Sequence, residues 1–328
     1  MLAYIVRRIF LMIPTVFGIS LVAFLIIQLP PGDFLDGVIS AMESDGNQVS
    51  AEMVAALRAR YGLDQPIYVQ YWKWISGIVL RGDFGMSFEW RQPVADLIWE
   101  RTGLTFLLSL LTLVFVWIVS FPIGIYSAVK RYSVGDYVAT FFGFVGLAIP
   151  NFLLALVLLY LVYVNFGVNL SGLFSSQYEN APWSWAKFVD LLTHLWLPLI
   201  VLGSSGIASL FRIMRANLLD ELYKPYVVTA RAKGLPEWKL ILKYPVRVAL
   251  NPFISTVGWV LPDLVSGAVI TAVVLNLPLT GPMLLRALQS QDMYLAGSFI
   301  MLLGVLTVIG TLISDILLAV LDPRIRYR

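Results

Sequence analysis

The sequence contains no cysteine and only one histidine, His194. Without cysteine the chain can form neither a disulfide nor a thiolate metal site, so any segment outside the cytoplasm must fold without covalent cross-links. A single histidine excludes a histidine-rich metal centre. Charge is also scarce, because only 13% of the residues are charged and the net charge is +3. So small a net charge gives no support for a nucleic-acid partner.

Apolar residues, by contrast, are abundant. Of the 328 residues, 59% are hydrophobic, and the mean hydropathy is +0.81. A soluble domain has about 25% charged and about 45–50% apolar residues. This composition therefore predicts a membrane protein.

Six runs are long and apolar enough to cross a bilayer, which takes about 20 residues in a helix. They cover residues 9–29, 104–129, 138–166, 195–214, 252–275 and 296–321. The first run follows Arg7 and Arg8, but it is longer than the apolar region of about 7–15 residues in a cleaved signal peptide. No small-x-small cleavage site follows it, so we expect a retained anchor. The prediction is an all-α membrane protein with six transmembrane helices, residues 1–29 holding the first.

Lysine and arginine predict the orientation of these helices. The N-terminus, residues 130–137, 212–251 and the tail 322–328 together hold 15 basic and 5 acidic residues. The segments on the other side hold 8 basic and 13 acidic residues. We therefore place the N- and C-termini in the cytoplasm.

The segment from residue 30 to residue 103 is expected to be an extracytoplasmic lobe between the first two helices. A helix is predicted from Ser50, a plausible N-cap, to Tyr61, just before Gly62. Tryptophans follow, and they have two interpretations: an aromatic belt at the membrane surface, or a docking platform for an outer partner. These tryptophans are Trp72, Trp74, Trp90 and Trp99.

The cytoplasmic segment 215–251 is too long for a plain hairpin. Its pattern predicts a short helix over residues 224–233, a turn at Gly234, and a second helix from Pro236 to about Arg247, bent near Pro245. Such a pair would project below the bilayer as a knob within the core 104–328, which holds the other five predicted transmembrane helices. The alternative is a basic segment attracted to anionic lipid.

Several kinds of chemistry have no motif in this sequence. No lysine follows a glycine, so there is no G-x-x-x-x-G-K-[ST] phosphate loop, and neither H-E-x-x-H nor G-x-S-x-G is present. We therefore expect no bound cofactor, no metal and no enzymatic activity in this chain. Two acidic residues, Asp263 and Asp315, lie within predicted spans, where charge is costly and often functional. Two separated carboxylates give little support for a proton relay, and therefore for a gradient-driven carrier.

Asp263 is a candidate residue of a pathway or gate, with a buried structural hydrogen bond as the alternative. Pro150 and Asn151 are further candidates, because a proline inside the third run would free the carbonyl of Gly146 and kink the helix. Kinks of this kind occur around translocation paths and also in ordinary packed membrane helices.

The segment Thr229–Leu235 reads T-A-R-A-K-G-L. It resembles the cytoplasmic motif of bacterial binding-protein-dependent importer permeases, and more closely the version in the dipeptide/oligopeptide ABC importer family. Other segments with similar sequence run nearly end to end. They include residues 61–66, G-D-F-G-M-S at 82–87, Ile149-Pro150 with Phe152, and L-D-P-R-I at 321–325.

The resemblance implies a type I ABC importer permease architecture in a bacterial inner membrane. The implied partners are a second homologous permease, two ATP-binding cassette ATPase subunits that bind ATP and Mg, an extracytoplasmic solute-binding protein, and membrane lipid. It also implies that the short cytoplasmic helix sits in a cleft of the ATPase and transmits its closure. The coupling residues so implied are Pro225, Thr229, Ala230, Arg231, Ala232, Lys233, Gly234 and Leu235.

The sequence departs from the family pattern at two places, and the second affects the prediction of the solute. The glutamate of the general motif falls at Val228, which is usual for the peptide branch. Where that branch often has glutamate followed by P-G-L-G, this chain has Ala272 and Pro278-Leu279-Thr280-Gly281. Peptides are the first expectation for the solute, with oligosaccharides, opines or nickel complexes as alternatives.

Overall fold

The computed structural model describes residues 2–28, 55–56, 65–87, 89–179, 181–251, 253, 269–290 and 292–321. These residues are mostly helical. Their only β-type pairing is an isolated antiparallel bridge between Met86 and Pro93, and the described ranges contain no strand. The all-α prediction is confirmed for this part of the chain.

The chain divides into two compact units, which share the long helix α5 (Val94–Val129) and the C-terminal helix α15 (Met293–Leu321). One unit contains Phe106–Pro278 and Gly310–Arg328, and the other Leu2–Thr105 and Leu279–Ile309. The helices of the first unit, besides most of α5, are α6 (Val134–Ala148), α7 (Asn151–Phe166), α8 (Trp185–Leu222), α9 (Pro225–Ala232), α10 (Glu237–Lys243), α11 (Pro245–Ala249) and α13 (Val269–Val274). The second unit has α1 (Leu2–Gln28), α4 (Ile67–Arg81), α14 (Thr280–Gln289) and most of α15.

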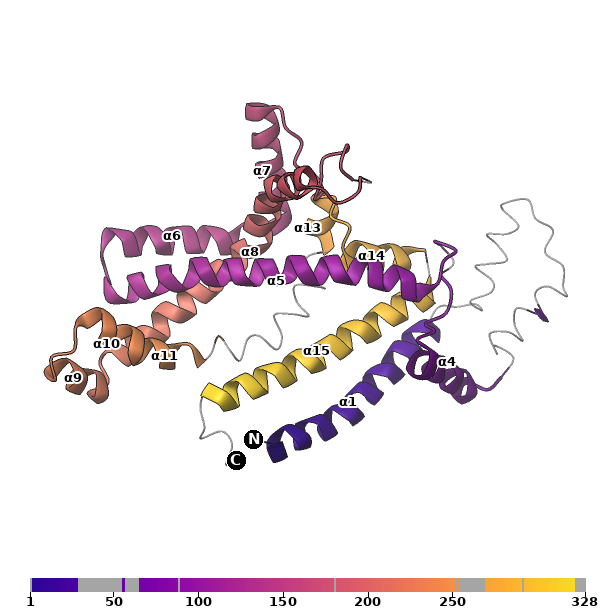
Figure 1. Cartoon of the computed structure of the whole chain (residues 1–328), viewed down its shortest axis with the longest axis horizontal. Helices are drawn as coiled ribbons and strands as arrows, with labels where there is room; N and C mark the ends of the chain where they lie inside the picture. Colours follow the sequence, from indigo (N-terminus) through magenta and orange to yellow (C-terminus); the bar gives the residue numbers. More distant parts are fainter. Residues whose placement is uncertain are drawn as a thin grey trace. The chain divides into compact units, whose positions relative to one another are not determined.

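In the first unit, α8 packs against α6, α7 and α11. Small residues allow the close approach of α6 and α8, since a Cβ at Gly146 would lie only 3.3 Å from the Ser204 carbonyl oxygen. The core continues to the far end of α8, where α9, α10 and α11 gather (Figure 1). Its fully buried members include Met214, Leu218 and Leu240.

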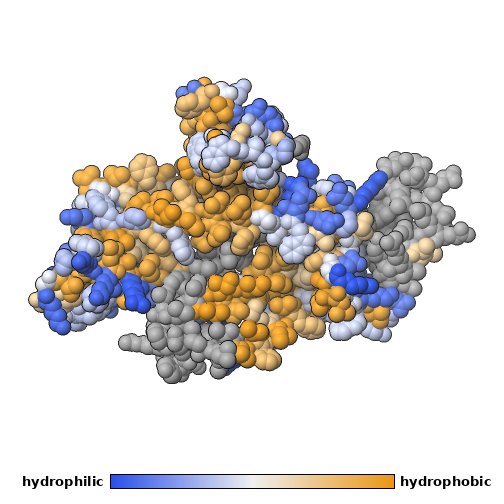
Figure 2. Space-filling view, in the orientation of Figure 1, coloured by the Kyte–Doolittle hydropathy of each residue, from blue (hydrophilic) through white to orange (hydrophobic). Residues whose placement is uncertain are grey.

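In the second unit, α1 and α15 touch at Gly304, where an added Cβ would lie 2.5 Å from Ile19. Hydrophobic side chains cover both helices (Figure 2). The chain before α5 is fixed to the start of α15 by the buried Asp292, which accepts a 2.5 Å hydrogen bond from the Ser87 hydroxyl. Two apolar clusters surround these contacts.

Four described helices are long and apolar enough to span a membrane: Val6–Ile26 of α1, all of α5, all of α8, and Met293–Ile316 of α15. Helices α6 and α7 qualify only as a pair, bent by 104° at the break between them. The predicted span 252–275 falls mostly outside the described residues. The structure thus gives four candidate spans, or five if the bent pair is one span.

The predicted third span, 138–166, was wrong in its shape. A single kinked helix was expected, but α6 ends at Ala148 and α7 begins at Asn151. Ile149 is extended, with φ −88° and ψ 121°, which is the conformation that a following proline favours. Because Pro150 also lacks an N–H, two helices with different directions replace the kink.

Two helices begin well before their predicted spans. Helix α5 starts at Val94 rather than near residue 104, so the end of the expected lobe 30–103 is already helical. Helix α8 starts at Trp185, after an N-cap at Ser184, rather than near residue 195. Most of the predicted Ser50–Tyr61 helix lies outside the described residues, and only residues 55–56 of it are seen to be helical.

Candidate functional site

The segment predicted to be cytoplasmic forms three short helices, α9, α10 and α11, where the sequence predicted two, over residues 224–233 and from Pro236 to about Arg247. Pro225 occupies the first turn of α9, where its missing N–H costs nothing. Pro236 is the N-cap of α10. The predicted bend near Pro245 is a full break, since Tyr244 (φ −112°, ψ −77°) separates α10 from α11.

The turn between α9 and α10 depends on Gly234. Its φ is +78°, in the left-handed region, and its N–H donates a 3.0 Å hydrogen bond to the Arg231 carbonyl oxygen. An added Cβ would meet no atom within 4 Å. The requirement for glycine here is therefore conformational rather than steric.

An ion pair bridges the same turn. Arg231 Nε donates to Glu237 Oε2 at 3.0 Å, and the guanidinium reaches the second carboxylate oxygen as well. The hydrogen bond from Arg231 holds the pKa of Glu237 below its usual value. The stabilisation from this pair is thus present above the ordinary carboxyl pKa and is lost as pH falls through the lowered one. Both side chains are about half exposed, so the contribution is small.

The buried side of α9 faces the core of its own chain. Val227 and Ala230 pack in the same cluster as Leu240 and Met214. Ala230 was predicted to lie against the ATPase, but only 7% of it is exposed, because its side chain is covered by the chain itself. Thr229, Ala232 and Lys233 are exposed on the other side of α9, while Leu235 is half-buried.

Large apolar side chains are exposed on α9 and α10 and at Tyr223, the C-cap residue of α8. Tyr223, Val228, Trp238 and Leu242 are exposed, the tryptophan by 63%. Single exposed apolar residues are ordinary, but several on one small projection form an exposed apolar patch. We refer to these four residues, with Thr229, Ala232 and Lys233, as the knob surface.

Helix α9 is also tied to the end of α8. The Tyr226 hydroxyl donates a 2.5 Å hydrogen bond to the Glu221 carboxylate. Burial, together with this carboxylate, raises the pKa of Tyr226 above its ordinary value, so the phenol stays protonated. Helix α9 is therefore joined to α8 by a polar link as well as by apolar packing.

Two of the other predicted candidates, Pro150 and Asn151, lie at the α6–α7 break. Asn151 Oδ1 accepts a 3.2 Å hydrogen bond from the Ser204 hydroxyl, and its amide nitrogen lies 3.4 Å from the Ser205 hydroxyl. The break beside Pro150 is thus held against the Gly203–Gly206 segment of α8. Asp263, the third candidate, lies outside the described residues.

One polar cluster was not singled out from the sequence. Arg215 of α8 donates two 2.8 Å hydrogen bonds to the Asp136 carboxylate, from Nε and from an Nη nitrogen. The Asp136 side chain is only 3% exposed, and it also accepts a hydrogen bond from the Tyr132 N–H. A usable signal was present, because Ser133 followed three residues later by Asp136 is a capping pattern at a helix start.

The chain matches two family models. The description "Binding-protein-dependent transport system inner membrane component" fits residues 120–327, and the N-terminal model of the same kind of component fits residues 1–110. The match thus includes both the knob and the α6–α7 break.

Three relatives are similar over the whole length of both chains. The oligopeptide transport system permease protein AppB of Bacillus subtilis is 37% identical over 328 residues. The dipeptide transport system permease protein DppB of Escherichia coli is 33% identical over 344 residues. The glutathione transport system permease protein GsiC of E. coli is 31% identical over 328 residues. This chain therefore belongs to the family of inner-membrane components of binding-protein-dependent transport systems, as a permease subunit of the ABC transporter type.

Proposed function

We propose that this chain is one of two permease subunits in an ATP-driven importer of short peptides, with the solute delivered by a binding protein. The family membership and the full-length similarity to permeases named for oligopeptides, dipeptides and glutathione support this proposal. The sequence departure at Ala272 and Pro278–Gly281 keeps oligosaccharides, opines and nickel complexes as the alternatives to be tested.

The proposed assembly has a second homologous permease, two ATPase subunits and an extracytoplasmic binding protein. ATP and Mg bind to the ATPase subunits, and this chain carries no cofactor. The distribution of basic residues supports a location of both termini in the cytoplasm and an extracytoplasmic lobe over residues 30–103. The apolar runs support six transmembrane helices, and the family resemblance supports the type I arrangement.

The knob surface is the proposed contact with the ATPase. Its exposed tyrosine, valine, tryptophan and leucine supply apolar area, and Gly234 fixes the angle between α9 and α10. Val227, Ala230 and Leu240 join the two helices to α8 in one core. Closure of the ATPase would thus move α8 rather than bend a loose loop, because packed helices shift as units.

A pathway role for Pro150, Asn151 and Asp263 is the finer part of the proposal. The bonds from Asn151 to Ser204 and Ser205 support it, since they link the break between α6 and α7 to the helix that carries the knob.

The function is tested in two steps. First, the purified chain alone should show no ATP turnover, and ATP hydrolysis should appear only when the ATPase subunits co-purify with it. Second, in a thermal-shift panel the cognate binding protein should be stabilised by di- and oligopeptides, and the same peptides should enter proteoliposomes only with ATP. Hydrolysis by the chain alone, or stabilisation by oligosaccharides, opines or nickel complexes but not by peptides, would contradict the proposal.

The topology makes a separate prediction. A reporter that is active only in the cytoplasm, fused after Arg328, should be active, and the same reporter placed after Gly82 should be silent. Basic residues are costly to translocate, and the tail holds Arg324, Arg326 and Arg328. Activity of the Gly82 fusion would show that the orientation is reversed.

A further inference from the structure

Helix α4 presents two different apolar faces. Tyr71, Trp74 and Gly77 are buried on one side. On the other side Tyr68, Trp72 and Val79 are 72%, 67% and 72% exposed, and Leu80 is 79% exposed. Spacings of four and seven residues place Tyr68, Trp72 and Val79 on one stripe of the helix. We call these four exposed residues the α4 outer face.

The buried face of α4 packs on α1, and the position of this contact along α1 places α4 relative to the apolar run of that helix. The Tyr71 hydroxyl lies 2.8 Å from the Ser20 hydroxyl, and the Tyr71 ring packs on Phe24 with a centroid distance of 5.4 Å. It also makes an edge contact with Phe17 at 6.3 Å. All three partners lie inside Val6–Ile26, the run of α1 that is apolar enough to span the membrane.

A depth follows from helix geometry. Ser20 is six residues before Ile26, which corresponds to about 9 Å along α1 at a rise of about 1.5 Å per residue. At the other limit, the amide of Gln28, beyond the apolar run, donates a 3.0 Å hydrogen bond to the Gln70 side chain. Helix α4 therefore lies at the level where the apolar part of α1 ends. Amphipathic helices that lie in a membrane interface bury their apolar face about 5–10 Å into the boundary.

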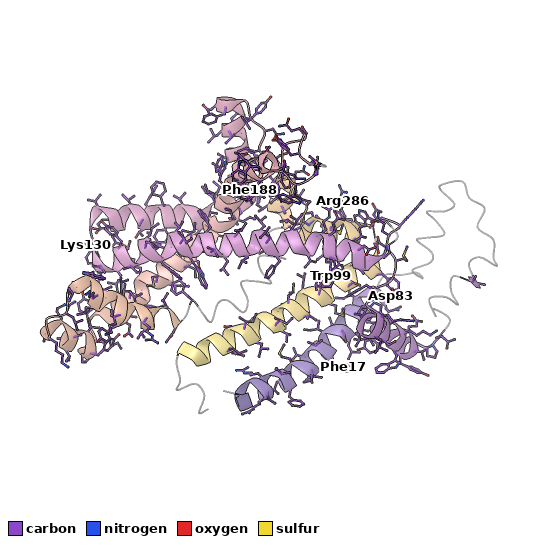
Figure 3. The ribbon with its side chains drawn as sticks, in the orientation of Figure 1. Phe17, Asp83, Trp99, Lys130, Phe188 and Arg286 are labelled. Atoms are coloured by element: carbon purple, nitrogen blue, oxygen red, sulfur yellow. The ribbon has the colours of Figure 1, made fainter. Side chains whose placement is uncertain are left out.

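The surroundings and composition of α4 fit the same location. Phe10, Ile13, Phe17 and Val22 of α1 are exposed by about half or more, as expected of a surface in contact with lipid. Figure 3 labels Phe17 on α1 and Asp83, which follows α4. Tryptophan and tyrosine concentrate at the level of the lipid headgroups. Lys73 and Arg81 are exposed on the same helix, where an anionic headgroup would meet them.

We infer that α4 is an interfacial helix whose outer face, made of Tyr68, Trp72, Val79 and Leu80, inserts into the lipid leaflet at the Gln28 end of α1. In the proposed topology this is the outer leaflet. Helix α4 is then the lipid-facing part of the extracytoplasmic lobe proposed above, and its outer face contacts lipid rather than the binding protein. This inference depends on the membrane location of the chain and not on which solute it transports.

The absence of native cysteine allows a direct test. Single cysteines are introduced as Trp72→Cys and Val79→Cys, labelled with an environment-sensitive fluorophore, and the assembled importer is placed in nanodiscs of phosphatidylethanolamine and phosphatidylglycerol. Quenching is measured first without binding protein and then after the binding protein is added. The control is Glu89→Cys, an exposed charged position after α4. Two quenchers are compared: aqueous iodide, and a lipid with a nitroxide on its acyl chain near the headgroup.

We expect the nitroxide lipid to quench both α4 labels severalfold more than it quenches the Glu89→Cys label, and iodide to show the reverse order. Three results would overturn the inference. Iodide could quench the α4 labels as well as the control, neither quencher could reach them because protein covers the face, or the binding protein could protect labels that iodide otherwise reaches. The last result would assign the face to docking. Because the variants replace exposed side chains, folding of α4 against α1 is kept.

Discussion

Replacing Gly234 by valine should abolish solute uptake and leave membrane insertion intact. The left-handed φ of +78° costs a residue with a Cβ about 1 kcal/mol or more, and a β-branched side chain costs more. Relief of this strain would rotate α10 relative to α9 and change the shape of the knob surface. Insertion should not change, because residue 234 lies outside every predicted span. Uptake into proteoliposomes and co-purification of the ATPase, at matched expression, measure the effect.

Two matched variants show whether the loss comes from the knob. Gly167 also has a left-handed φ, of +67°, and no atom within 4 Å of an added Cβ, so Gly167→Val creates the same strain away from α9. It should retain clearly more uptake than Gly234→Val. Gly234→Asn should recover part of the activity, because asparagine tolerates the left-handed region better than valine does. Normal uptake by Gly234→Val would refute the coupling assignment.

The docking surface itself should be probed at Ala232 rather than at Ala230. Ala232 is exposed, so Ala232→Trp adds bulk where a partner would bind. Ala230 is buried in the core, so a tryptophan there would disrupt the chain's own packing and confuse the two effects. If the segment instead served only to attract anionic lipid, neutralising Lys233, Lys239 and Lys243 would reduce uptake most.

Replacing Arg215 by alanine should lower the stability of the permease by about 3 kcal/mol, through the buried charge that it leaves on Asp136. The Asp136 carboxylate is 3% exposed and would lose two hydrogen bonds, while it would keep the one from the Tyr132 N–H. Thermal unfolding of the detergent-solubilised protein, followed by loss of monodispersity, should show a clear fall in Tm.

Arg212 provides the matched control for this variant. It lies one turn earlier on α8 and is exposed, so Arg212→Ala should change Tm little. Arg215→Lys should recover only part of the stability, because a lysine keeps the charge but not the two parallel hydrogen bonds. The double variant with Asp136→Ala should be more stable than the sum of the single effects predicts. An unchanged Tm in Arg215→Ala would mean that the pair contributes nothing to the fold.

The sequence predicted the knob well because its signals are local. A proline at the start of each helix and a glycine between them specify short elements whatever they pack against, and α9, α10 and Gly234 appear where expected. Local sequence signals do not specify which side of α9 is buried. Ala230 and Ala232 differ by two residues and are chemically identical, and only the packing against α8 decides which one is covered.

The starts of the long helices and the contacts between distant segments were predicted less well. The length of an apolar run shows which part of a helix can lie in the bilayer, but not where the helix begins. Helices α5 and α8 start about ten residues before their predicted spans, because polar residues continue each helix at that end. The Asp136–Arg215 pair joins residues 79 positions apart, and nothing in the charge count identifies it. The contact of α4 with α1 likewise depends on Tyr71 reaching Ser20, 51 residues away.

The 104° change of direction between α6 and α7 affects how often the chain crosses the bilayer. At about 1.5 Å per residue, α6 and α7 are each about 22–24 Å long, shorter than an apolar layer of about 30 Å. If the pair crosses as one broken span, the six predicted spans give an even number of crossings, and the N- and C-termini lie in the same compartment. If α7 returns to the side from which α6 came, the number becomes odd and the ends are separated. The reporter after Arg328 therefore also determines the route taken at Pro150.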